Sequence, residues 1–88
     1  MKIKILNNST NNYIIYNFDF VNHKMNINKD YINNDNILNM IFENKNYDEV
    51  ISWIRSRVGG KQINECIEIA RTNNLKNLKD DLLIFIED

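Results

Sequence analysis

The alternation of aromatic and polar residues in the first third of the chain constrains the fold most strongly. Residues 13–21 are rich in aromatic and β-branched side chains, and from Tyr16 to Phe20 every second residue is aromatic. A period of two predicts a β-strand with one buried face. Residues 2–6 alternate lysine with isoleucine in the same way. We therefore expect two strands in this part of the chain.

A third strand is predicted from a hairpin centred on Asn22 and His23. If these two residues form a tight turn, Val21 pairs with Lys24 and Phe20 pairs with Met25, so that apolar residues face apolar residues. The prediction is an antiparallel three-stranded meander with strands at about 2–6, 13–21 and 24–28. Its apolar face consists of Tyr16, Phe18, Phe20, Met25 and Ile27. A face of this kind needs a cover.

Helical spacing of apolar residues supplies that cover from residue 34 onward. Apolar residues at 37, 38, 41 and 42 predict one helix, and those at 47, 50, 51, 54 and 58 predict a second. Asn46 with Glu49 is typical of a capping box at the start of the second helix. Gly59 and Gly60, the only glycines, predict its end. Asn64 is the expected N-cap of a third helix, which runs to about residue 72.

The C-terminal residues allow two interpretations. Residues 82–86 are a continuous apolar run, which fits a buried strand beside residues 2–6. Leucine and phenylalanine at positions 75, 78, 82 and 85 fit a helix, and we favour the helix because this spacing begins before the run. The predicted fold is thus α+β: one domain over residues 1–88, with a sheet at about 1–28 and about four short helices over 34–88, packed as helical hairpins.

Composition limits the class of protein. The chain has 88 residues, a net charge of −1, one cysteine, one histidine and no proline, which is typical of a single small folded domain. It has 18 asparagines, 15 isoleucines and 8 lysines, whose codons are AT-rich, so we expect a low-GC genome. No apolar stretch is long enough to span a membrane, and the start of the chain lacks the features of a signal peptide. We expect a cytoplasmic protein without membrane contact.

The sequence offers no catalytic, metal or cofactor site. His23 is predicted to lie in a turn, without a nucleophile or a second metal ligand near it in sequence. Cys66 lies on the apolar side of the third helix, where a free cysteine behaves as a small hydrophobic residue. We therefore predict that the protein is not an enzyme and binds neither a metal nor a cofactor.

A candidate binding site is formed by Trp53, Arg55 and Arg57 on the second helix, with Lys61 after the glycines. Trp53 lies beside the apolar stripe, so it either covers a neighbouring core residue or presents a partly exposed ring. Tryptophan and arginine are enriched in the residues that dominate protein interfaces. Tyr13, on the expected outer face of the sheet, is a further candidate.

These features favour a small protein-interaction module that binds and occludes a protein partner. The small size and AT-rich composition suggest an inhibitor encoded by a phage, virus or mobile element and directed against a host defence complex, similar to an anti-CRISPR protein. The alternative is a nucleic-acid-binding protein that uses Arg55, Arg57 and Lys61. The net charge of −1 argues against this alternative. The oligomeric state is left open.

Overall fold

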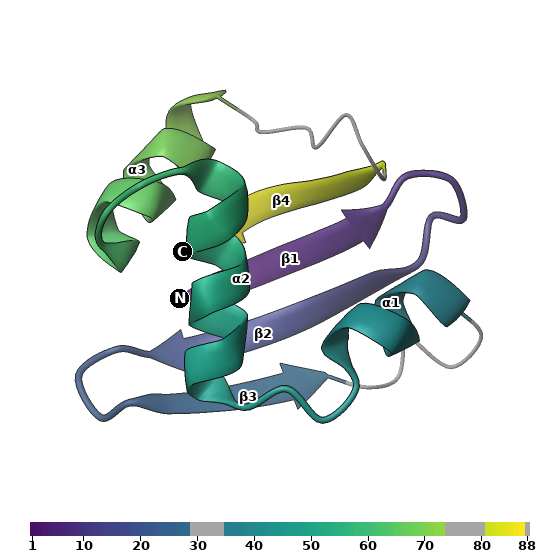
Figure 1. Cartoon of the computed structure of the whole chain (residues 1–88), viewed down its shortest axis with the longest axis horizontal. Helices are drawn as coiled ribbons and strands as arrows, with labels where there is room; N and C mark the ends of the chain where they lie inside the picture. Colours follow the sequence, from purple (N-terminus) through teal and green to yellow (C-terminus); the bar gives the residue numbers. More distant parts are fainter. Residues whose placement is uncertain (29–34, 74–80, 88) are drawn as a thin grey trace.

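A four-stranded antiparallel sheet with helices on one side forms the part of the chain that the computed structural model describes, residues 1–28, 35–73 and 81–87 (Figure 1). The strand order is β3-β2-β1-β4. The α+β class is therefore confirmed, but the predicted counts are wrong: the described residues form four strands and three helices, whereas the sequence predicted three strands and about four helices. In chain order the elements are β1 (Lys2–Asn7), β2 (Tyr13–Asp19), β3 (Lys24–Asn28), α1 (Asn36–Phe42), α2 (Tyr47–Val58), α3 (Ile63–Asn73) and β4 (Leu82–Glu87).

One hydrophobic core lies between the sheet and the three described helices. Helix α2 crosses in front of the strands, with α1 and α3 on either side of it (Figure 1). Each strand contributes every second residue to the core, and each helix contributes the stripe that faces the sheet. The buried members are Ile3, Ile5, Ile14, Tyr16, Phe18, Leu38, Phe42, Val50, Ile54, Cys66, Leu82 and Ile84.

The β2–β3 hairpin exists as predicted, but the predicted register is wrong by two residues. Phe18 pairs with Met25, and Asp19 pairs with Lys24, so the loop has four residues and not two. The Asp19 carboxylate accepts hydrogen bonds from the backbone N–H of Asn22 at 3.2 Å and from its side chain at 2.8 Å. Within this loop His23 adopts a positive φ angle of 52°. These local bonds favour the longer loop.

The limits of α2 are confirmed. The Asn46 side chain accepts a hydrogen bond from the Glu49 N–H at 2.9 Å, and the Glu49 carboxylate accepts one from the Asn46 N–H at 3.1 Å. Gly59 ends the helix in the left-handed conformation, with φ of 86°. The prediction for α3 is wrong at its start, because the helix begins at Ile63 and Asn64 lies inside it.

Residues 82–86 form a strand, so the helix that we favoured there is wrong. β4 pairs with β1 along its whole length, with Ile84 opposite Ile5. In a strand, Leu82 and Ile84 are buried against the helices while Leu83 and Phe85 face the other side. Pairing with β1 provides hydrogen-bond partners for the backbone of this run, which is apolar on both sides. This pairing outweighs the helical spacing of positions 75, 78, 82 and 85. Residues 75 and 78 of that spacing lie outside the described part of the chain.

The buried carboxylate of Asp35 ties the β1–β2 loop to the start of α1. It caps α1 by accepting the Leu38 N–H at 2.8 Å. It also accepts the Thr10 hydroxyl at 2.6 Å and the side-chain amides of Asn7 at 3.1 Å and Asn12 at 3.3 Å. This network fixes α1 over one end of the sheet. Within the described ranges, no helix has the length and apolarity that crossing a membrane requires.

Candidate functional site

The sheet has a second face, which the described helices leave uncovered. The strand register places Leu6 between Tyr13 and Leu83, and it places Lys4 between Ile15 and Phe85. These six residues alternate with the core residues of the same strands, so they point away from the helices. All six are half-buried. We call them the outer-face cluster: Lys4, Leu6, Tyr13, Ile15, Leu83 and Phe85.

Lys4 lies in the middle of the outer-face cluster. Its ammonium group lies 4.5 Å from the centre of the Tyr13 ring and 5.9 Å from that of the Phe85 ring. A cation at this distance is attracted by the negative face of an aromatic ring. The two rings belong to β2 and β4, the strands on either side of β1, and their contacts hold one positive charge within the apolar cluster. The arrangement can bind an anionic group of a partner if apolar surface surrounds that group.

The rest of the outer face is polar and balanced in charge. Lys2 lies opposite Glu87 in the register, and Asp19 lies opposite Lys24. Hydrogen bonds from the side chain and backbone of Asn22 hold the pKa of Asp19 below its ordinary value. The face therefore has an apolar half with Lys4 at its centre and a charged half beyond it.

Trp53 on α2 is half-buried. It covers a core residue and also presents a partly exposed ring, so both of the alternatives drawn from the sequence apply. Its ring meets the Phe42 ring edge-on, with 4.7 Å between the ring centres, so Trp53 covers a core residue. The guanidinium group of Arg57 lies 4.5 Å from the centre of the Trp53 ring. Trp53 and Arg57 are four residues apart and form one stack on one side of α2.

Arg55 does not join this stack. It is two residues from Arg57, which corresponds to about 200° around a helix. Its guanidinium group donates a hydrogen bond to the backbone carbonyl of Lys61. The predicted group of four residues is thus two separate features: the stack of Trp53 with Arg57, and the contact of Arg55 with Lys61 beyond the end of α2.

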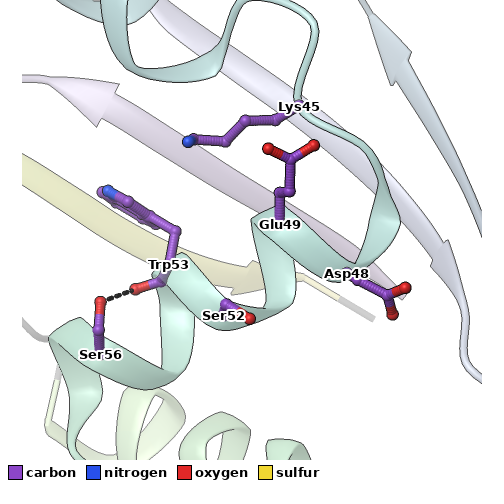
Figure 2. Close-up of a pocket in the computed structure, with 6 residues that line it drawn as sticks. All are labelled: Lys45, Asp48, Glu49, Ser52, Trp53 and Ser56. Atoms are coloured by element: carbon purple, nitrogen blue, oxygen red, sulfur yellow. Dashed lines mark hydrogen bonds between the residues drawn. The ribbon is translucent and has the colours of Figure 1, made fainter.

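A shallow hollow of about 430 Å³ lies beside Trp53. Figure 2 shows the Lys45 side chain extending toward Trp53, while the Asp48 side chain points away from it. The Ser56 hydroxyl donates to the Trp53 carbonyl at 2.8 Å (Figure 2). The hollow is lined by Lys45, Asp48, Glu49, Ser52, Trp53 and Ser56. Both charge signs line it, so it has no preference for one kind of ion.

His23 is exposed and contacts a neighbouring ring, whereas Cys66 lies in the core. The His23 ring contacts the Tyr47 ring, with 5.4 Å between their centres. Cys66 is fully buried, and its sulfur packs where a side chain on Gly60 would otherwise stand. Among the described residues, no three histidine, cysteine, aspartate or glutamate side chains gather as a metal site would require.

Of the candidates from sequence, only Tyr13 belongs to the outer-face cluster. Its predicted place on the outer face is confirmed by the pairing with Leu6. The other five members were not singled out from the sequence. Lys4 and Leu6 could have been identified from the sequence of β1, because they alternate with isoleucines that face the core. Leu83 and Phe85 could have been identified only if residues 82–86 had been predicted to form a strand.

No protein family, curated protein or solved structure matches this chain in the three comparisons made.

Proposed function

We propose that this chain is a small non-enzymatic protein-interaction module that acts by binding and occluding a protein partner. The observation that carries the proposal is the outer-face cluster. It gathers two aromatic and three aliphatic side chains on the sheet face that the described helices leave uncovered. Contiguous apolar surface with a polar surround is typical of protein interaction sites.

The fuller form of the proposal concerns origin and target. A single small domain with AT-rich codon usage fits a protein that a phage, virus or mobile element encodes to inhibit a host defence complex. We place its action in the cytoplasm of the host cell. Occlusion requires no catalytic group, which agrees with the lack of a nucleophile–base pair or a metal-ligand pattern in the sequence.

An affinity pull-down with two variants tests the proposal. The tagged full chain is incubated with lysate of a low-GC host cell, with and without nuclease, and bound proteins are identified by mass spectrometry. We expect one stoichiometric protein that survives nuclease treatment. The variant Tyr13→Ser/Phe85→Ser should lose this protein. The variant Arg55→Glu/Arg57→Glu, on α2, should retain it.

The opposite pattern would overturn the assignment of the site. If Arg55→Glu/Arg57→Glu loses the partner while the sheet variant retains it, binding occurs on α2. Thermal unfolding of both variants, followed by circular dichroism, shows whether a loss of binding reflects a loss of folding.

A second candidate function is binding of single-stranded nucleic acid. The observation in its favour is that the Tyr13 and Phe85 rings lie near Lys4 on the sheet face that the described helices leave uncovered, since aromatic rings with a nearby cation can stack on bases. Asp19 and Glu87 on the same face oppose it. Phosphate contacts would make binding fall steeply between about 50 and 200 mM salt, whereas a protein interface dominated by apolar contacts would depend on salt weakly.

A further inference from the structure

We propose that the partner of the outer-face cluster is an amphipathic helix that carries one aspartate or glutamate in the middle of its apolar stripe. This inference rests on the proposed function, because it specifies the partner for the same surface.

The carboxylate follows from the surroundings of Lys4. Lys4 is half-buried between Ile15 and Phe85, and its ammonium group lies over the Tyr13 ring. Among the described residues, Lys4 forms no ion pair. A wholly apolar partner would remove water from the ammonium group and leave a buried, uncompensated charge, which is strongly unfavourable. A partner that covers the cluster must therefore bring an anionic group to Lys4.

The helical shape follows from the dimensions of the cluster. It occupies three neighbouring strands, which span about 10 Å, and two successive outward positions on each, which span about 7 Å. A single α-helix with side chains is about 10 Å across. One helix can therefore cover the cluster, with apolar residues three and four positions on either side of its carboxylate contacting Leu6, Ile15 and Leu83.

A second copy of this chain does not fit the cluster. Two copies packed face to face around a two-fold axis would bring the centres of their clusters together. That centre lies on β1 between Lys4 and Leu6, so each ammonium group would face the other copy's Lys4 or Leu6. Either arrangement buries the charge without a carboxylate, because the cluster contains none. Nucleic acid fits less well than a helix, because half of the cluster consists of Leu6, Ile15 and Leu83, whose aliphatic side chains do not stack on bases as aromatic rings do.

Peptide display tests the inference without knowledge of the natural partner. A phage-displayed library of helical peptides of about 18 residues, randomised on one face, is selected against the immobilised full-length wild-type protein and, separately, against Lys4→Glu. We expect wild-type selection to enrich aspartate or glutamate at one central position between apolar residues. Selection against Lys4→Glu should enrich lysine or arginine at that position.

Affinities of the best wild-type peptide then test the contact directly. Fluorescence anisotropy should show binding to Lys4→Glu that is about tenfold weaker or more, and Lys4→Met should also bind more weakly. The matched control is Lys24→Glu, which makes the same charge change on an exposed lysine of β3 and should change the affinity by less than about twofold. Replacement of the peptide carboxylate by lysine should restore binding to Lys4→Glu. Thermal unfolding verifies that each variant is folded.

The inference and the proposed function fail in distinguishable ways. If the selected peptides lack an acidic position, or if Lys4→Glu binds them as tightly as wild type, the acidic helix is wrong. The interaction module still stands in that case if the outer-face variant loses its captured protein. If polyuridylate binds the wild type but not Lys4→Glu, and no peptide is enriched, nucleic acid is the ligand and both proposals are wrong.

Discussion

Replacement of Asp35 by alanine should destabilise the fold by about 2–4 kcal/mol. Loss of the N-cap of α1 costs about 1 kcal/mol. The side-chain amide of Asn7, which is 1% exposed, would lose the acceptor that it contacts at 3.1 Å, and a buried unsatisfied donor costs about 1–3 kcal/mol. The sum is a large part of the total stability of a small domain, which is about 5–15 kcal/mol.

Two further variants separate these contributions. Asn46→Ala removes the N-cap of α2, where the capping side chain is exposed, so it should cost about 1 kcal/mol without an additional buried donor. Asp35→Asn retains an oxygen that can accept the Leu38 N–H, and its loss of stability should lie between the other two. The measurement is urea unfolding, followed by far-ultraviolet circular dichroism and by the fluorescence of Trp53. If Asp35→Ala costs no more than Asn46→Ala, the buried network does not contribute stability as we argue.

The same carboxylate should make stability depend on pH. Burial raises the pKa of Asp35, but hydrogen bonds from the Leu38 N–H and from Thr10, Asn12 and Asn7 outweigh burial and hold the pKa below its ordinary value. The unfolded chain has a pKa of about 3.9 at this residue. Its stabilisation is therefore complete above about pH 4 and is lost as the pH falls through the lower pKa of the folded state. Asp35→Asn should lose less stability than wild type on acidification, and equal losses would contradict this assignment.

Three other substitutions test the packing. Ile54→Ala, at a core position that is 1% exposed, should cost about 2–5 kcal/mol in urea unfolding. Gly60→Ala should cost about 1–3 kcal/mol, because the added Cβ would lie 2.6 Å from the Cys66 sulfur; a neutral result would mean that α3 shifts readily. Gly59→Ala has open space but a φ of 86°, so its cost of about 1–2 kcal/mol comes from backbone conformation.

The β2–β3 hairpin shows why faces were easier to predict than register. A shift of two residues leaves every side chain on the same face, so the apolar pattern of Phe18 and Met25 allows both pairings. The two registers differ in the loop, where Asp19 binds Asn22 and His23 adopts a left-handed conformation. In a chain with 18 asparagines, one more asparagine near a turn carries little information. The limits of α2 were predictable because the capping box and Gly59 act within a few residues.

β4 was not predictable from local pattern because its environment is distant in the sequence. A run that is apolar at every position shows neither the period of a strand nor that of a helix. Residues 82–86 are therefore compatible with either structure. The choice is made by β1, which offers a free edge along its whole length and pairs Ile3 with Ile86 and Ile5 with Ile84. The favourable pairing exists only once the rest of the sheet has formed.

The error at β4 also explains why the outer-face cluster was missed. Because side chains alternate between the two faces of a strand, Lys4 and Leu6 on β1 could have been assigned to the outer face. Tyr13 was assigned to that face. Without β4, however, Lys4 is an ordinary lysine at the edge of a sheet, where charge is common and prevents aggregation. With β4 in place, the Phe85 ring lies on its other side, and the same lysine becomes the centre of an apolar surface. The chemistry of the surface is thus a property of the strand order, which is why a single charge reversal at Lys4 is the most direct test of what the surface binds.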